Sequence, residues 1–462
     1  MRARGFLLSI LPAVAIVLAL SGRATAVAAD ESSDDSVGTI ATLLGDKDKD
    51  IRALGLQQVR EAAKGTKATE QFAGLLAKLP ADARVGLLDA LADRGDKAAR
   101  LAVLEQLRSQ DGAVRDAALR ALGSIGEPAD MPQLVQFLST GSEADQAAAR
   151  GSLTHLPGHT IDTAIAGELA GATPKIRSEI IEILAARRAI GTVSNLLTAA
   201  EDSDPMVRKA AMAALGELAT PCAKDVGSML RGVVKAEPGT ERDAAEKAVL
   251  LVCNRIEDPA KRAAPILVGW TQLFTEDQRT ILLPALGRVG GPDALKVVEA
   301  AIADPNPRRA DAGIRAICNW PDATVAPRLL ALFQSNADPE RQSLLLRALT
   351  RVAVLHDKRS NAQRLALLKT CMSLATHDDE RNYVVKRAAA VRTVDALRFL
   401  VPFLERPPLA QEACASIVEL AHHRELRLPN EAEFAKALDA VIRICKDPGV
   451  VDHAQRYKAN KT

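Results

Sequence analysis

The feature that most constrains this chain is a helical pattern that returns about every 31 residues. It is clearest in "SDPMVRKAAMAALGEL" (203–218), where apolar side chains fall on one face of a helix. These apolar positions are Val207, Ala211, Ala214, Leu215 and Leu218. Asp204 is placed to cap the start of this helix, and Pro205 suits its first position. The pattern recurs at 111–126, 173–187, 275–290 and 338–352.

Aligning these segments places an arginine or glutamine at one equivalent position of each repeat. This arginine column consists of Arg52, Arg84, Arg115, Gln146, Arg177, Arg208, Arg242, Arg279, Arg309, Arg341, Arg381 and Gln411. The positions seven residues further on are all apolar: Val59, Leu91, Leu122, Leu153, Leu184, Leu215, Val249, Leu286, Ala316, Ala348, Ala388 and Val418. Because a register chosen on polar residues also aligns apolar ones, the period marks a real structural unit.

Each repeat contains a second helical pattern after a turn, as at 130–140, 190–201 and 292–304. Gly and Pro punctuate the turns, and the alternation typical of strands is absent. A hairpin of this length cannot bury its apolar face alone, so consecutive hairpins must stack. We therefore predict an all-α fold, an α-α superhelix of about twelve helical hairpins over residues 37–446, with the second helices lining its concave surface.

The motif D-x-x-V-R-x-x-A-x-x-A-L-G at 204–216, with variation at 111–123, resembles the short bacterial form of the HEAT repeat. The segments 282–332 and 394–421 resemble HEAT arrays of exported bacterial proteins that are often joined to, or encoded near, 3-keto-disaccharide hydrolase-type domains. The resemblance implies a HEAT-like solenoid and, as context only, a link to carbohydrate metabolism. No such β-rich catalytic domain is expected here, because the helical pattern runs to about Lys446.

The beginning of the chain has the layout of a secretory signal peptide. Arg2 and Arg4 precede an apolar run over 6–20, and small residues follow it, which predicts a signal peptide over 1–28. The alternative, an uncleaved anchor, is disfavoured because the run is shorter than the roughly 20 residues that span a bilayer. We expect export to the periplasm or cell exterior, and no membrane span in the mature chain. An acidic leader (29–36) should follow the signal, and a short helix with a frayed tail (447–462) should end the chain.

Charge and composition narrow the class of partner. The formal net charge is +2, and removal of Arg2, Arg4 and Arg23 with the signal lowers it to −1. Only 3% of the residues are aromatic. Binding to nucleic acid relies on a basic surface and on aromatic rings that stack on bases, so we expect no nucleic-acid partner.

Six cysteines lie in the second half of the chain, without a CxxC pair: Cys222, Cys253, Cys318, Cys371, Cys414 and Cys445. An even number in an exported chain permits disulfides, but the sequence does not give their connectivity. Cys222 and Cys253 lie at similar turns of successive repeats, so a bridge between them is one possibility. The alternative is that cysteines such as Cys253, Cys318 and Cys414 are small buried hydrophobes.

No arrangement of residues predicts a catalytic, cofactor or metal site. His155 and His159 have a suggestive spacing, but Pro157 and Gly158 would break the helix that could place them on one face. His422 and His423 are adjacent and should point in different directions, and His377 precedes a helix start. The deoxyhypusine hydroxylase type of HEAT enzyme binds di-iron through His-Glu pairs, and no His here is followed by Glu. There is no G-x-S-x-G motif for nucleophilic catalysis.

Two further features admit two interpretations each. The arginine column forms either a ladder of anion-binding groups or bonds to acids and carbonyls inside the solenoid, for which the guanidinium fork is suited, and we favour the second. Trp320, at a turn, either plugs the space between repeats or anchors a partner, and we favour the plug.

These observations predict a non-enzymatic scaffold that binds a protein partner through a long concave face. The alternative is an accessory module of a carbohydrate-processing assembly that binds an enzyme or a glycan. Aromatic residues gathered on one groove would favour a glycan, and the chain has only two Trp and two Tyr. The sequence does not identify the partner.

Overall fold

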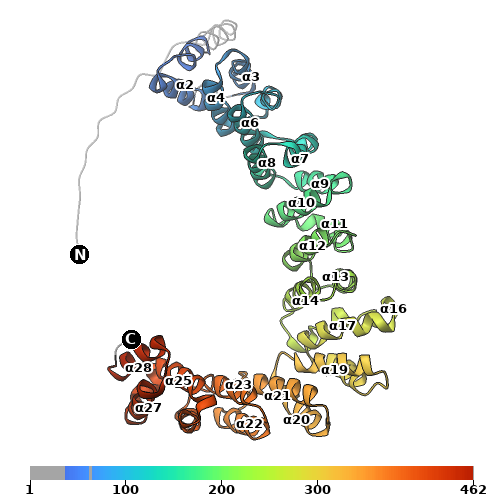
Figure 1. The fold of residues 1–462 in the computed structure, drawn as a ribbon. Helices are drawn as coiled ribbons and strands as arrows, with labels where there is room; N and C mark the ends of the chain where they lie inside the picture. The colour runs from blue at the N-terminus through green and yellow to red at the C-terminus, as the bar shows by residue number, and fades with distance from the viewer. Residues whose placement is uncertain (1–36, 62–64, 461–462) are drawn as a thin grey trace, which may run out of the picture. The chain divides into compact units, whose positions relative to one another are not determined.

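The computed structural model describes residues 37–61 and 65–460, which form helices and turns without a strand. The chain divides into two compact units, Met1–Gly191 (unit 1) and Thr192–Thr462 (unit 2). In each unit helical hairpins stack in chain order, so the predicted all-α solenoid is confirmed (Figure 1). The predicted signal peptide and acidic leader lie outside the described residues.

Unit 1 begins with a helical stretch at 37–44, followed by hairpins. Its first helices are α2 (Lys49–Glu61), α4 (Ala81–Arg94), α6 (Gly112–Ile125), α8 (Glu143–His155) and α10 (Pro174–Ala186). Its second helices are α3 (Thr66–Gly74), α5 (Arg100–Gln106), α7 (Met131–Thr140) and α9 (His159–Gly167). Consecutive first helices contact one another, as α4 and α8 both contact α6.

Unit 2 begins with the short α11 (Val193–Ala199) and continues the same scheme. Its first helices are α12 (Pro205–Leu218), α14 (Thr240–Cys253), α17 (Glu276–Val289), α19 (Pro307–Cys318), α21 (Pro339–Ala353), α23 (Asp378–Ala388) and α25 (Pro407–His422). The helices that follow them are α13 (Ala223–Lys235), α15 (Ala264–Leu267), α16 (Trp270–Leu273), α18 (Pro292–Ile302), α20 (Ala326–Ser335), α22 (Asn361–Leu374), α24 (Val394–Leu400), α26 (Arg424–Arg427) and α27 (Glu431–Ile444). A last helix, α28 (Pro448–Lys458), packs on α25 and α27.

The structure confirms the capping residues and the apolar face that predicted the first helices. The Asp204 carboxylate accepts a hydrogen bond from the Met206 N–H, with Pro205 at the first position of α12. Asp111 caps α6 in the same way. The apolar face of α12 is buried, including Val207, Ala211 and Leu215. The first helices therefore form where a capping residue precedes an apolar stripe.

The core lies between the two rows of helices and is built mainly of aliphatic side chains. Leu122 and Leu153 from first helices, and Leu134 and Ile165 from second helices, are completely buried. Small residues let the helices approach closely. The Gly287 Cα of α17, for example, lies against the backbone of Ala316 in α19. Trp320 is 1% exposed, which confirms the interpretation of it as a plug.

One prediction about the fold is wrong. Within unit 2, the first helices α21, α23 and α25 lie on the inner side of the curve, and α20, α22 and α27 lie on the outer side (Figure 1). The concave side of this unit is therefore lined by first helices and not by second helices. No helix among the described residues is long and apolar enough to cross a membrane.

Candidate functional site

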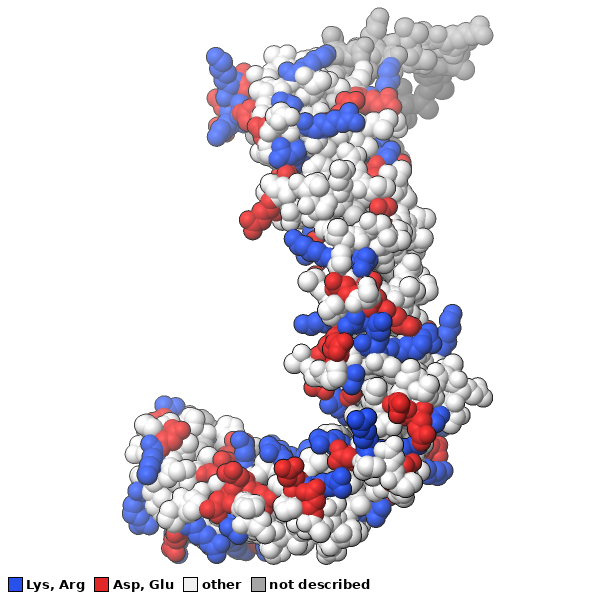
Figure 2. Space-filling view, turned by 45° about the vertical axis from the view of Figure 1, so that its right-hand side comes forward, with Lys and Arg blue, Asp and Glu red and all other residues white. Residues whose placement is uncertain are grey.

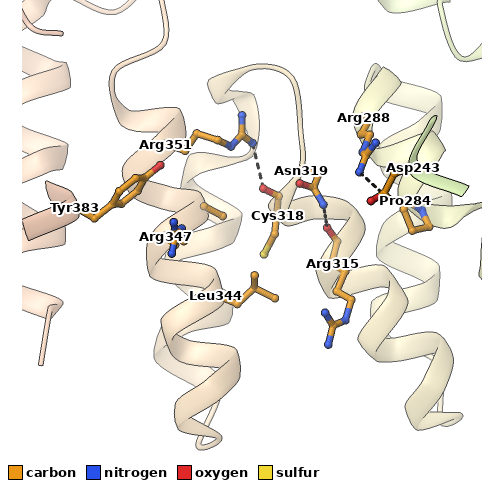
Figure 3. Close-up of a pocket in the computed structure, with 11 residues that line it drawn as sticks. Asp243, Pro284, Arg288, Arg315, Cys318, Asn319, Leu344, Arg347, Arg351 and Tyr383 are labelled. Atoms are coloured by element: carbon orange, nitrogen blue, oxygen red, sulfur yellow. Dashed lines mark hydrogen bonds and ion pairs between the residues drawn. The ribbon is translucent and has the colours of Figure 1, made fainter. Parts of the chain in front are cut away.

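The first helices of unit 2 line an open cavity of about 480 Å³. Five successive first helices contribute to it, from α14 through α17, α19 and α21 to α23 (Figure 3). The lining residues are Asp243, Pro284, Arg288, Arg315, Cys318, Asn319, Leu344, Arg347, Ala348, Arg351 and Tyr383. Because these residues span more than a hundred positions of the sequence, only the stacking of the helices brings them together.

The lining is basic, with four guanidinium groups and one carboxylate. Arg288 is 3.7 Å from Asp243 Oδ1, and Arg315 Nε donates to Asp311 Oδ2 over 2.7 Å. Arg351 Nη2 donates to the carbonyl oxygens of Cys318 and Trp320, and burial lowers the pKa of this arginine.

Arg347 differs from the other three arginines of the cavity. Its guanidinium group lies over the Tyr383 ring, 5.0 Å from the ring centroid. Within residues 37–61 and 65–460 it forms no ion pair or side-chain hydrogen bond. Arg347 is also exposed, so its charge is available to a ligand that enters the cavity.

The carboxyl group of Glu246 is buried next to Arg288. Glu246 of α14 is 3% exposed, and its Oε2 atom has no hydrogen-bond partner among the described residues. Burial raises the pKa of Glu246 to about 7, although Arg288 Nη1 lies 3.5 Å away and favours the ionised form. The folded chain therefore holds a proton on Glu246 at pH values where an unfolded chain has released it.

Replacing Glu246 by glutamine should change the pH dependence of stability. Between pH 4.5 and about 7 the folded state of the native chain binds the extra proton, so its free energy of unfolding falls as pH rises. Above pH 7 this loss is complete, and E246Q should be more stable than the native chain by about 1–3 kcal/mol. At pH 4 the two should be equal. Urea unfolding across this range measures the difference. Glu299→Gln, which removes one member of an exposed ion pair with Arg328, should leave the pH dependence of the free energy of unfolding unchanged. If E246Q and the native chain showed the same pH dependence, the prediction would be contradicted.

The arginine column bonds within the solenoid. Seven of its members donate to a backbone carbonyl five or six residues earlier: Arg52, Arg115, Gln146, Arg177, Arg208, Arg242 and Arg279. Three of them also reach an acid of the following repeat, as in the pairs Arg52–Asp82, Arg115–Asp145 and Arg208–Glu241. The structural interpretation of the column is thereby confirmed for these members.

The register of the column slips at Arg309 and Arg341. Arg208 lies four residues after the capping Asp204, whereas Arg309 and Arg341 lie three residues after their caps, Asn306 and Asp338. Their side chains bond differently as a result. Arg309 pairs with Glu276 and Arg341 lies 3.6 Å from Asp311, and both acids belong to the preceding repeat. The equivalent position in α21 is the next residue, whose side chain donates to the Asn336 carbonyl over 2.7 Å.

A second set of arginines, not predicted from the sequence, also bonds within the solenoid. Four arginines at or just after the end of a first helix donate to carbonyls that end the preceding first helix: Arg94 to Val59, Arg187 to Leu153, Arg255 to Ala219, and Arg351 to Cys318. These carbonyls lack a partner within their own helix, and a cation is favourable there. A signal existed, because Arg94, Arg187 and Arg351 each follow a column member by ten residues.

The histidines and cysteines that were considered as sites do not form one. His155 Nδ1 lies 2.7 Å from the Gly151 carbonyl oxygen, and His159 is exposed at the start of α9. His377 precedes α23 as expected. His422 Nδ1 lies 2.9 Å from Tyr457 Oη, a contact that the sequence did not suggest. No group of His, Cys, Asp or Glu that could hold a metal ion is found in the described part of the chain.

All six cysteines are free thiols in the structure, so the possible Cys222–Cys253 bridge is not formed. Cys253, Cys318, Cys371 and Cys414 are buried, which fits the interpretation of them as small hydrophobes. Burial raises the pKa of the Cys253 thiol to about 12, so it is a poor nucleophile at neutral pH.

Another hollow, of about 540 Å³, lies where turns meet near Trp320 in unit 2. Its charged groups already have partners. Arg262 Nε donates to the Ile256 carbonyl, and Asp322 accepts from the Thr324 N–H. Both charged side chains of this hollow bond to the backbone, whereas Arg347 forms no ion pair with a described residue, so the cavity on the first helices is the better candidate.

Comparison with known proteins agrees with the geometry of the repeats. Residues 69–154 and 163–250 match a family model of HEAT repeats. None of the curated proteins matches this chain in sequence.

The solved structures that this chain resembles include karyopherins. A mutant of Kap121p has a TM-score of 0.50 and 13% identity over 93% of this chain and 54% of that chain. Kap121p bound to the extreme C-terminus of the protein phosphatase Cdc14p has a TM-score of 0.49 and 14% identity over 88% of this chain and 54% of that chain. This chain therefore spans about half the length of the Kap121p chains that it matches. At such identities the similarity concerns the fold alone.

Proposed function

We propose that this protein is an exported, non-enzymatic scaffold that binds a protein partner through the first helices of unit 2. The observation that carries the proposal is the cavity to which five successive first helices contribute. A stack of hairpins gives a long surface of many moderate contacts, which suits a protein segment better than a small compact ligand.

The composition of this surface favours protein over the other classes of ligand. Tyr383 is the one aromatic residue in the cavity lining, so the stacked rings that hold glycans are lacking there. Lys and Arg side chains alternate with Asp and Glu over the face that Figure 2 shows, without the continuous basic stripe of a nucleic-acid interface. The proposal of export rests on the predicted signal peptide at residues 1–28. The resemblance to HEAT arrays of exported bacterial proteins would allow a carbohydrate-processing enzyme as the protein partner.

Crosslinking in the cells that produce the protein tests this proposal. A photo-crosslinking amino acid at Leu344, in the cavity, should attach one recurrent exported protein, which mass spectrometry then identifies. The same amino acid at Lys369, exposed on α22 on the opposite row, should not attach it. Glycan fragments or no adduct from Leu344 would contradict the proposal. Equal amounts of adduct from both positions would show that the first helices do not form the binding face.

A further inference from the structure

The cavity on the first helices of unit 2 carries positive charge that its surroundings do not neutralise. Among the residues that the structure describes, Arg347 has only the Tyr383 ring as a partner, and Arg351 bonds to backbone carbonyls. One turn after Tyr383, the Nε atom of Arg387 is buried without a hydrogen-bond partner among the described residues. These three arginines come from α21 and α23, so the positive charge is concentrated at this end of the cavity.

The acids close to the cavity are already engaged elsewhere. Asp243 pairs with Arg288 at the far end, and Asp311 accepts from Arg315 while lying 3.6 Å from Arg341. Glu380, in the first turn of α23, accepts from the backbone N–H groups of Thr376 and His377. Asp379 lines a smaller hollow of about 220 Å³ together with Arg347 and Tyr383, but none of these acids forms an ion pair with Arg347.

The walls between the arginines are apolar. In Figure 3 the side chains of Cys318 and Leu344 lie between Arg347 and Arg315. Ala348 and Pro284 add to the apolar part of the lining. A ligand that fits must therefore combine a negative group with a short aliphatic stem.

We propose that this cavity binds an acidic segment of the partner protein, placing a glutamate or aspartate carboxylate between Arg347 and Arg315. The carboxylate accepts hydrogen bonds from both guanidinium groups, whose planar forks match its geometry, and its stem packs on Leu344. This inference rests on the proposed function, because it supplies the chemistry of the segment that the scaffold recognises.

A peptide is favoured over a nucleic acid by the lining itself. The lining contains a single aromatic ring, and Arg347 already covers one of its faces, so successive bases have no row of rings on which to stack. A cavity of about 480 Å³ accommodates a few side chains, not a duplex.

Fluorescence anisotropy of the full mature chain with a labelled peptide of alternating glutamate and alanine tests the inference. We expect saturable binding that weakens as salt is added, and no binding of the matching glutamine peptide. Arg347→Glu should weaken binding at least about tenfold, since a charge-assisted hydrogen bond is lost and a like charge is introduced. Arg347→Lys should restore part of the affinity, because it keeps the charge and loses the fork.

Arg308→Glu is the matched control. Arg308 is also exposed, also lies on a first helix of unit 2, and does not line the cavity. This variant should bind the peptide like the native chain. Equal weakening by Arg308→Glu and Arg347→Glu, or binding of single-stranded RNA in a way that depends on Arg347, would overturn the inference.

The two proposals fail in different ways. If crosslinking from Leu344 yields a protein partner whose binding survives Arg347→Glu, the scaffold function stands and the acidic-segment inference falls. If the glutamate peptide binds through Arg347 but no protein crosslinks, the acidic site stands and the scaffold function falls.

Discussion

Replacing Arg208 by alanine should lower the free energy of unfolding of unit 2 by about 3–5 kcal/mol, because it leaves a nearly buried carboxylate without its cation. Arg208 is 5% exposed. Its Nε and Nη2 atoms donate to the two oxygens of Glu241 over 2.8 and 3.1 Å, and Nη1 donates to the carbonyls of Asp202 and Ser203. Alanine removes all four bonds, and urea unfolding measures the loss.

The same variant should show a change with pH. Burial alone would raise the pKa of Glu241, but hydrogen bonds from Arg208 and from the Glu237 N–H hold it below its usual value. The native chain therefore gains stability from this carboxylate above its unfolded pKa and loses that gain as pH falls through the folded value. In Arg208→Ala the gain should be absent at neutral pH, so the two chains should differ least in acid.

Arg231→Ala is the matched control for Arg208→Ala. Arg231 donates to Glu201 over 2.8 Å, but both side chains are more than 40% exposed. Exposed ion pairs contribute about 0–1 kcal/mol, so this variant should unfold almost like the native chain. If Arg208→Ala left stability unchanged and abolished partner binding, the arginine column would be an anion-binding ladder after all.

Replacing Gly287 by alanine should destabilise unit 2 by about 1–3 kcal/mol or more, against the usual trend for glycine within a helix. Alanine normally stabilises such a position by about 1 kcal/mol. Here a Cβ at residue 287 would lie 2.7 Å from the Ala316 carbonyl carbon and 2.8 Å from its Cα. These are backbone atoms, so α17 and α19 would have to separate.

Gly227→Ala provides the control in the same unit. Gly227 also lies within a helix and is buried, but the nearest atom to its Cβ would be Leu273 Cδ1 at 3.6 Å, an ordinary contact. This substitution should be neutral or stabilising. Thermal melts of the two variants should therefore shift in different directions, and equal shifts would show that α17 and α19 tolerate separation.

The repeat, its caps and the arginine column could be predicted because they depend on neighbouring residues. Asp204 caps α12 through its own backbone, and Arg208 reaches carbonyls of the loop just before it. The slip of register at Arg309 and Arg341 could not be predicted, because the residue seven positions further on is apolar in either register. Both Ala316 and Ile317 are buried, for example, and so are Ala348 and Leu349.

The candidate site could not be predicted from the sequence either, for a different reason. Which row of helices lines the concave side depends on small rotations between successive hairpins, and these follow from packing such as that of Gly287 on Ala316. Arg347 and Tyr383 lie 36 positions apart, in neighbouring first helices, so their contact depends on the stacking of whole helices. A pattern within one helix carries no information about it.

The arginines that reach back to the preceding first helix make some joints between successive repeats stiffer than others. Where Arg351 joins α21 to the end of α19, the two repeats cannot move apart without breaking its bonds to the Cys318 and Trp320 carbonyls. At the end of α25, within the same unit, the equivalent position is Ala421, whose buried apolar side chain offers no such bond, so this joint yields more gradually. Under tension, a chain built this way extends first at the unclamped joints, while the joint beside the cavity keeps its spacing.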